Sequence, residues 1–337
     1  MLNYLQFPIL KTTTYQKEGF FMDVSVFTNC KEKVLKNCGR VIVGKDEAIT
    51  LVFTSFLCSG HVLLEDVPGT GKTMLLRAFA KTIGGDFRRI QFTPDLLPSD
   101  LTGINFYNQK SGEFQFRKGP LFSNIILADE INRATPRTQS SLLEAMEERQ
   151  ISVDGTTSRL DEPFMVMATQ NPLESYGTFP LPEAQIDRFF MKLKLGYMNR
   201  DEEIAVMRRR PSVQLVEELE CVVSMEEINQ MKEMIPQITV SDDVAGYIMD
   251  IVAKTRSEQQ FILGVSTRGT IALYKAAQTT AALNGRDYVL PEDVRYLIPF
   301  VLAHRISVGA TTRTGDIEEY LEKMLSQIPA PLEKVHS

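Results

Sequence analysis

The chain has 337 residues, which corresponds to about two domains and to a core large enough to need no disulfide or metal staple. Its 43 acidic and 37 basic residues give a formal net charge of −6, which disfavours a protein that wraps nucleic acid. An apolar fraction of 43% and a charged fraction of 24% are typical of globular proteins and exclude bulk disorder.

The cysteines and the start of the chain indicate a cytoplasmic protein. The 4 cysteines are scattered and form no C-x-x-C pair, so we expect reduced thiols and neither disulfides nor a structural zinc site. Residues 1–21 carry charges and lack an apolar run with a cleavage site, so we expect no signal peptide. A run of ~18 apolar residues is missing throughout, so we expect no membrane span.

The pattern of apolar residues predicts an extension over residues 1–24 and an α/β domain over residues 25–198. Short apolar strands alternate there with helices, which is typical of a parallel sheet covered on both faces. The predicted strands are His61–Glu65, Arg89–Phe92, Ile125–Asp129, Phe164–Thr169 and Phe190–Leu195. After Tyr197 the strand signal fades, and we expect an all-α domain over residues 199–337.

A glycine-rich loop follows the first predicted strand and precedes a helix expected from about Lys72. Such a loop directs backbone N–H groups at phosphate oxygens, and the helix N-terminus adds its dipole. Lys72 can reach the β- and γ-phosphates, and the Thr73 hydroxyl can bind Mg²⁺. The expected ATP-binding residues are Asp66, Val67, Pro68, Gly69, Thr70, Gly71, Lys72 and Thr73. The alternative is a glycine-rich turn that holds no ligand.

Asp66 departs from the phosphate-loop pattern, which has a glycine at this position. We expect its carboxylate at the mouth of the loop to turn away from the phosphates.

Two adjacent carboxylates, Asp129 and Glu130, end the strand Ile125–Asp129. In an open parallel sheet, ligands bind at the carboxyl ends of strands, and two adjacent acids there repel each other unless a cation lies nearby. Asp129 is suited to the Mg²⁺ shell and Glu130 to orienting the attacking water. The alternative is a solvated acidic strand end.

Asn171 follows the next predicted strand, in the sequence Thr-Gln-Asn-Pro. A neutral amide there could place water near the γ-phosphate without adding charge. The alternative is a turn-forming Asn-Pro pair.

Together these features resemble an AAA+ ATPase, and further stretches resemble the MoxR family of that class. The stretches are Gln91–Gly103, Ala128–Ala134, Leu142–Glu147, Ala168–Pro172, Leu181–Phe189 and Asn284–Val294. The resemblance implies a P-loop NTPase core followed by an all-α lid, and a ring, expected to be a homo-hexamer. It also implies that Val43 and Gly44 contact the adenine and that Asn171 is sensor 1.

The resemblance further implies roles for two arginines. Arg188 matches the arginine finger, which acts on the γ-phosphate of the neighbouring subunit. The alternative for Arg188 is a salt bridge with Asp187. Arg268 matches sensor 2 of the lid, although Thr267 stands where the family often has proline, and its action within or between subunits stays open.

Two hairpins are expected within the first domain. One joins Ile104–Tyr107 to Glu113–Phe116 and resembles an insert that faces the ring pore and the partner; the alternative is a solvated structural hairpin. The other runs from Gln150 to Leu160 through the turn Asp154-Gly155.

The leading functional hypothesis is an ATPase that acts as a chaperone-like remodeller. The resemblance implies that it matures partner proteins, often of the von Willebrand factor A type, in some cases with insertion of a metal or cofactor. One alternative is a nucleotide-gated assembly scaffold with little turnover. The other is a nucleic-acid-dependent motor, which the net charge of −6 disfavours.

Overall fold

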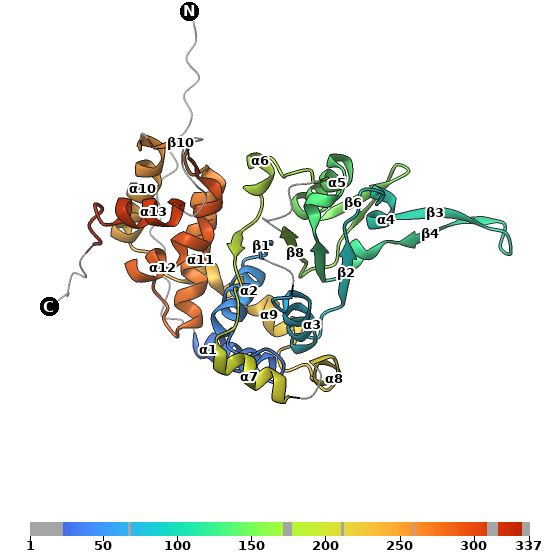
Figure 1. Ribbon diagram of the computed structural model, residues 1–337, viewed down its shortest axis with the longest axis horizontal. Coiled ribbons are helices and arrows are strands. Elements are labelled where there is room, and N and C mark those ends of the chain that lie inside the picture. Colours follow the sequence, from blue (N-terminus) through green and yellow to red (C-terminus); the bar gives the residue numbers. More distant parts are fainter. Residues whose placement is uncertain are drawn as a thin grey trace, which may run out of the picture.

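The computed structural model describes residues 23–66, 69–170, 177–209, 212–258, 260–308 and 316–331. A parallel sheet lies between two layers of helices, and a helical bundle lies beside them (Figure 1). This arrangement confirms the predicted fold class, a P-loop α/β core followed by a helical lid. Almost all of the predicted extension, residues 1–22, lies outside the described part of the chain.

Five parallel strands form the central sheet in the spatial order β2–β5–β8–β1–β9. They match the five predicted strands and are β1 (Val62–Glu65), β2 (Phe87–Gln91), β5 (Ile125–Asp129), β8 (Met165–Gln170) and β9 (Met191–Leu193). Successive side chains point to opposite faces, so Val62 and Leu64 enter one apolar cluster and Leu63 the other. The strands are buried on both faces, which explains their continuous apolar sequences.

Helices from different parts of the chain cover the two faces of the sheet. One face packs on α1 (Ser25–Cys38), α2 (Asp46–Leu57) and α3 (Lys72–Thr82). The other face packs on α4 (Pro98–Thr102) and α5 (Pro136–Glu148). A single turn, α6 (Glu183–Ile186), precedes β9.

The lid is helical, with one addition that the sequence does not predict. Its helices are α10 (Asp242–Ser257), α11 (Thr267–Leu283), α12 (Pro291–Val301) and α13 (Asp316–Leu325). Phe261–Leu263 (β10) and Ser307–Val308 (β11) pair as a short antiparallel ribbon. Both segments are too short to carry a periodic apolar pattern, so the expectation of an all-α lid is corrected in this detail. Of the described helices, none has an apolar stretch long enough to cross a bilayer.

Three further helices connect the sheet to the lid: α7 (Arg200–Arg208), α8 (Ser212–Glu217) and α9 (Met225–Met234). Although they follow residue 198, α8 packs on α3 and α9 packs on α2. One continuous apolar cluster runs from the sheet through these helices into the lid. The domain boundary near residue 198 therefore stays a prediction.

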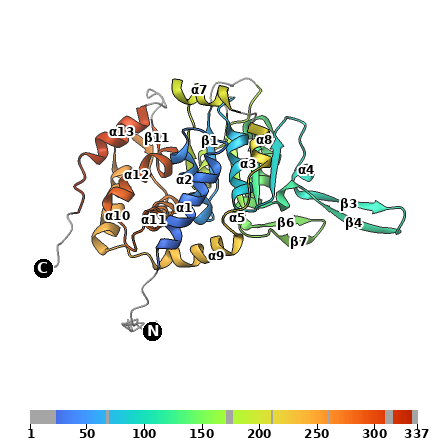
Figure 2. The same cartoon turned by 90° about the horizontal axis from the view of Figure 1, so that it is seen from below.

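Two antiparallel hairpins project from the same side of the sheet layer (Figure 2). Gly103–Asn108 (β3) pairs with Glu113–Lys118 (β4), and Gln150–Val153 (β6) pairs with Thr156–Arg159 (β7). Both hairpins are predicted from sequence. The amide of Asn105 in the first donates a 2.8 Å hydrogen bond to the Asp154 carboxylate in the second, so the hairpins lie side by side.

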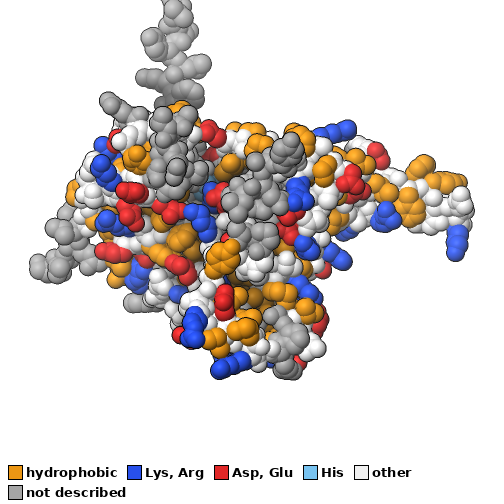
Figure 3. Space-filling view, viewed as in Figure 1, with side chains coloured by type: hydrophobic (Ala, Val, Ile, Leu, Met, Phe, Trp, Pro, Cys, Tyr) orange, Lys and Arg blue, Asp and Glu red, His pale blue; other side chains and the backbone are white. Residues whose placement is uncertain are grey.

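The longer hairpin, β3–β4, exposes aromatic side chains to solvent (Figure 3). Phe114 is 75% exposed and Tyr107 is 55% exposed, and their rings meet edge to face with centroids 5.4 Å apart. Phe106 and Phe116 are also exposed. Aromatic side chains held on a rigid ribbon are typical of a contact surface.

His61 fastens the start of β1 to two neighbouring elements. Its buried ring accepts a 2.9 Å hydrogen bond at Nδ1 from the Val166 amide, and Nε2 donates to the Met146 carbonyl at 3.0 Å. Burial, with a further contribution from Arg149, lowers the pKa of His61 from 6.5 to about 3. The ring is therefore neutral at physiological pH and serves as a structural group.

The lowered pKa of His61 predicts an acid-dependent loss of stability. Above about pH 6.5 the His61 imidazole is neutral in both the folded and the unfolded protein. Below about pH 6.5, and down to about pH 3, it binds a proton only in the unfolded chain. Between pH 7.5 and 5.5, the free energy of unfolding should fall by about 1.4 kcal/mol through this group. Urea unfolding of the wild type and of His61→Gln at both pH values measures this change in the free energy of unfolding. Equal pH slopes in the two proteins would contradict the assignment.

Candidate functional site

The glycine-rich loop joins β1 to α3 and leaves open space above its glycines. Gly69 and Gly71 have φ values of +87° and +89°, in the left-handed region that other residues rarely adopt. A Cβ at either position would have no atom within 4 Å, so it would project into the space that a ligand needs. Helix α3 begins at Lys72, with its N-terminus at this space. An anion such as a phosphate chain fits such a cradle.

The carboxylate of Asp66 turns away from the loop, as the sequence predicts. It is buried, and its Oδ2 accepts hydrogen bonds from the backbone N–H groups of Leu195 and Gly196, at 2.8 and 3.0 Å. The Asp66 carbonyl accepts a 3.0 Å hydrogen bond from Nζ of Lys72. Asp66 thus ties the start of the loop to the connector after β9, which explains an acid where the usual pattern has glycine.

The segment Val43–Gly44, which is predicted to contact the adenine, lies against the same connector. Nζ of the adjoining Lys45 donates to the carbonyls of Leu195 and Tyr197, at 2.7 and 3.2 Å. Gly44 has a φ of +67°, and a Cβ there would lie 1.8 Å from Oε1 of Glu202 in α7. Glycine is therefore required at this position by both conformation and space.

Asp129 is held at the end of β5 by groups from both neighbouring strands. Thr169 of β8 donates to its Oδ1 at 2.7 Å, and Thr169 in turn accepts from the N–H of Glu130 at 2.8 Å. Nε and Nη2 of Arg89 in β2 donate to Oδ2, at 3.1 and 2.6 Å. A carboxylate has about four acceptor sites, two on each oxygen, so Oδ1, which accepts one hydrogen bond, retains a site for a metal-bound water.

Glu130 stands in a left-handed conformation, with a φ of +58°, directly after β5. Its Oε2 accepts a 2.7 Å hydrogen bond from Nε2 of Gln91 and lies 3.1 Å from Nε of Arg133. Gln91 also accepts from Nη2 of Arg89 at 2.8 Å. A continuous polar chain therefore runs from Asp129 through Arg89 and Gln91 to Glu130.

Sequence reasoning missed Arg89, Gln91 and Thr169 at this site. The sequence did contain a signal for them, because these residues lie at the ends of predicted strands. Those strands flank β5 in the sheet, and Gln91 pairs in register with Asp129. In a parallel sheet, the carboxyl ends of neighbouring strands meet at one edge.

One pocket of about 370 Å³ joins the loop to the acidic strand end. Of the residues predicted to bind ATP and Mg²⁺, it brings together Gly69, Gly71, Lys72, Thr73 and Asp129, and it adds the predicted catalytic residue Glu130. Its lining residues are Gly69, Gly71, Lys72, Thr73, Met74, Arg89, Gln91, Asp129, Glu130 and Thr169. Donor groups and a helix N-terminus on one wall and carboxylates on the other fit a phosphate chain with its Mg²⁺. The predicted residues Val67, Pro68 and Asn171 lie outside the described residues.

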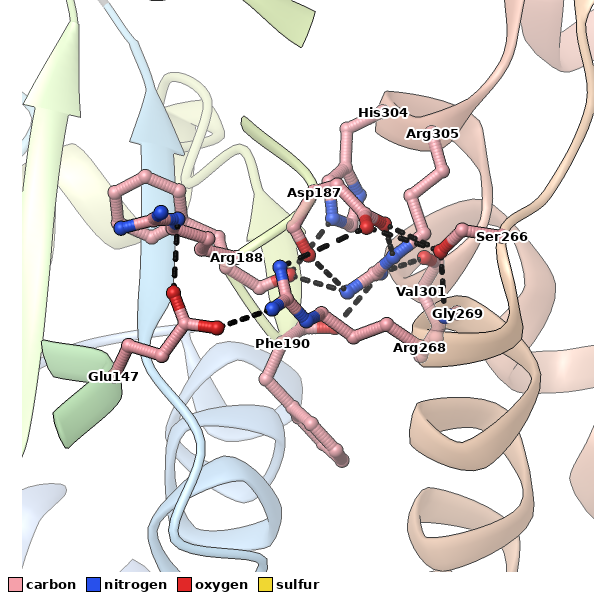
Figure 4. Close-up of polar contacts among 11 residues, drawn as sticks. Glu147, Asp187, Arg188, Phe190, Ser266, Arg268, Gly269, Val301, His304 and Arg305 are labelled. Atoms are coloured by element: carbon pink, nitrogen blue, oxygen red, sulfur yellow. Dashed lines mark hydrogen bonds and ion pairs between the residues drawn. The ribbon is translucent and has the colours of Figure 1, made fainter. Parts of the chain in front are cut away.

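The two predicted arginines, Arg188 and Arg268, lie elsewhere, where the sheet layer meets the lid (Figure 4). Both line a second pocket of about 230 Å³, and neither is among the described residues that line the phosphate pocket. Nε of Arg188 lies 3.1 Å from Oε2 of Glu147, and Arg268 pairs with Oε1 of the same carboxylate. Arg188 therefore forms a salt bridge within its own chain, as the alternative predicts, but its partner among the described residues is Glu147 and not Asp187.

Asp187 instead joins the segment before β9 to the lid (Figure 4). It accepts a 2.8 Å hydrogen bond from Nε of Arg305 and 3.0 Å hydrogen bonds from the Ser266 hydroxyl. Burial lowers the pKa of Arg305 to about 10 against the opposing effect of Asp187, so Arg305 stays charged at neutral pH. Arg305 also donates to the carbonyls of Phe189 and Phe190, at 2.6 and 3.2 Å.

Comparisons with known proteins agree with this geometry. The family model "ATPase family associated with various cellular activities (AAA)" matches residues 61–191, and the model "AAA lid domain" matches residues 253–323. "Uncharacterized protein YeaC" of Bacillus subtilis (strain 168) is 49% identical over 90% of this chain and 95% of its own length. "Chaperone MoxR1" of Mycobacterium tuberculosis is 38% identical over 89% of this chain and 82% of its own. A crystal structure from Cytophaga hutchinsonii ATCC 33406 superposes with a TM-score of 0.85 at 40% identity, covering 92% of this chain and 97% of its own.

The contact between Asp66 and the connector after β9 predicts a loss of stability when the carboxylate is removed. Asp66→Ala leaves the buried N–H of Leu195 without its acceptor. The free energy of unfolding should fall by about 2–3 kcal/mol. Asp66→Asn is the control, since its amide oxygen can still accept both hydrogen bonds and should restore most of the loss. Urea unfolding measures all three proteins, and equal losses in the two variants would contradict this role.

Proposed function

The chain belongs to the MoxR family of AAA+ ATPases, and we propose that it hydrolyses ATP to drive the remodelling of partner proteins. The observation that carries the proposal is the pocket that joins the loop Gly69–Thr73 to the carboxylates of Asp129 and Glu130. Phosphoryl transfer to water requires positioning and charge stabilisation at one place, and this pocket supplies the groups for both.

The residues predicted from the sequence each have a role in the proposed reaction. Lys72 and the backbone of the loop bind the β- and γ-phosphates, and Val43–Gly44 contact the adenine. Thr73 and, through water, Asp129 would hold Mg²⁺, which supplies charge neutralisation on the phosphate chain when bound. Glu130 orients the attacking water and accepts its proton, and Asn171 as sensor 1 helps to place that water.

The contacts of Glu130 support its role as the group that orients water. Gln91 and Arg133 both hold one oxygen of the carboxylate, Oε2. A restrained carboxylate keeps its second oxygen in a defined direction, which favours a near-attack geometry.

The distribution of arginines supports a ring, proposed to be a homo-hexamer. Arg188 does not line the phosphate pocket of its own chain among the described residues. An arginine finger in this position acts on the γ-phosphate of a neighbouring subunit. There it stabilises the negative charge that develops on the phosphoryl group during transfer.

The remodelled substrate is proposed to be a partner protein, often of the von Willebrand factor A type, whose maturation can include metal or cofactor insertion. The name of the relative "Chaperone MoxR1" supports a chaperone-like role. The exposed aromatic side chains of the β3–β4 hairpin, Tyr107 and Phe114, offer a contact surface for it. A cytoplasmic location is part of the same proposal.

Two substitutions test the proposed reaction. Lys72→Ala should abolish ATP binding, whereas Glu130→Gln should keep ATP binding and lower kcat by about 10²-fold or more, because the water loses its base. Glu144→Gln, at an exposed position of α5, is the matched control and should hydrolyse ATP at the wild-type rate. Phosphate release and nucleotide titration measure the two effects.

The same assays decide between the alternatives. Negligible hydrolysis by both wild type and Glu130→Gln, with ATP binding intact, would favour the assembly scaffold. DNA binding that falls with salt and stimulates hydrolysis would favour the nucleic-acid motor.

A further inference from the structure

Glu147 holds Arg188 and Arg268 at the same time, one on each carboxylate oxygen (Figure 4). The three side chains come from three separate elements: α5, the segment before β9, and the first turn of α11. Two guanidinium groups repel each other at close range, and a shared carboxylate between them offsets that repulsion. Glu147 therefore permits the two cations to lie side by side.

The position of Glu147 itself is well fixed. It lies in the last turn of α5, and the Met146 carbonyl in that turn accepts a 3.0 Å hydrogen bond from His61. Arg149, directly after the helix, donates to the carbonyls of Ser59 and Phe164. These contacts attach the end of α5 to the sheet, so Glu147 provides a fixed point for the two arginines.

Arg268 is also placed by its surroundings. The Ser266 hydroxyl accepts a 3.1 Å hydrogen bond from the Gly269 N–H, which begins α11 at a defined residue. The same hydroxyl donates to Asp187, the residue before Arg188. A Cβ at Gly269 would lie 2.7 Å from Cδ of Arg305, so the start of α11 packs closely on the arginine that donates to Asp187.

The contact with Glu147 runs through Nε of Arg188, which lies 3.1 Å from Oε2. The structure records no hydrogen bond from the terminal amino groups of Arg188 to any described residue. The terminal groups form the planar fork that binds phosphate oxygens in bidentate fashion. The described residues that line the pocket around them include four arginines and Lys275 but a single acid, Glu147, and this charge balance favours an anion. Asp187 does not line the pocket but lies 2.8 Å from Nε of Arg305 and 3.9 Å from Nη1 of Arg268.

We propose that Glu147 is a positioning residue that presents Arg188 and Arg268 as one pair to the phosphate chain bound by a second copy of this chain. The inference rests on the proposed ATPase function and names the residue that organises its trans-acting cations. Glu147 does not touch the nucleotide; it acts through the two arginines. The pair is then preformed before the neighbouring nucleotide arrives, which reduces the ordering cost of assembly.

Glu147→Gln keeps the size of the side chain and removes the charge that holds the arginines. We expect kcat for ATP hydrolysis to fall about tenfold, because misplacement of a catalytic cation by an ångström costs up to about 10²-fold. ATP affinity should stay within about twofold of wild type, since the variant's own pocket is untouched. Glu148→Gln, the exposed neighbour in α5, is the charge-matched control and should change neither parameter.

A mixing experiment distinguishes positioning across subunits from a local structural effect. Lys72→Ala subunits bind no ATP but carry intact arginines, whereas Glu147→Gln subunits bind ATP but present misplaced arginines. Co-assembled from both variants, the rings should hydrolyse ATP several-fold faster than the sum of the separate preparations. Where Glu147→Gln fails to fold, Glu147→Asp keeps the charge at a shorter reach and serves the same experiment.

The outcomes separate the inference from the function on which it rests. A wild type without ATPase activity would overturn the proposed function. An active wild type with an equally active Glu147→Gln variant, or mixed rings without recovery, would overturn the role of Glu147 alone. If inorganic phosphate, added in place of the Lys72→Ala subunit, restored the ATPase activity of Glu147→Gln, the arginines would form a site for a free anion. That result would also overturn the proposed role of Glu147.

Discussion

The in-register pairing of parallel strands sets the position of almost every polar group in the phosphate pocket. Gln91 lies opposite Asp129, and Thr169 lies near the end of β8 on the other side, so three strand ends deliver side chains to one edge. The loop after β1 opens at the same edge because β1 pairs with β8. A slip by one residue would turn each of these side chains to the opposite face and dismantle the pocket together with the core.

A second constraint connects this edge to the rest of the chain. The Asp66 carboxylate accepts the N–H groups at Leu195 and Gly196, and Lys45 bonds to carbonyls of the same connector. The phosphate loop, the predicted adenine segment and the entry to α7 are thereby held by one short stretch of backbone. Because the connector leads on to α7, hydrogen bonds as well as apolar packing join the helical layers to the phosphate loop.

Local sequence signals predict much of this structure, and long-range pairings explain the remainder. The Asp154-Gly155 turn has φ values of +49° and +80°, as its sequence predicts for a tight hairpin. The loop glycines and the acids after β5 are identifiable because their chemistry requires fixed spacing. Arg89 and Gln91 were missed because the sequence does not distinguish a polar residue that faces solvent at a strand end from one that binds a carboxylate there. Glu147 was missed because its partner Arg268 lies 121 residues away, and only the docked lid brings them together.

The two arginines lie where the lid meets the sheet layer, and their separation depends on both parts. Arg268 belongs to the lid and Arg188 to the sheet layer, and the Asp187–Arg305 ion pair holds the two parts together beside them. Any movement of α11 against the segment before β9 therefore changes the separation of the two cations. A partner that binds the lid would alter the charge offered to the neighbouring subunit without touching a nucleotide. The phosphate pocket and the arginine pair share no described lining residue, which supports the proposal that the arginines act on the phosphate pocket of a second chain.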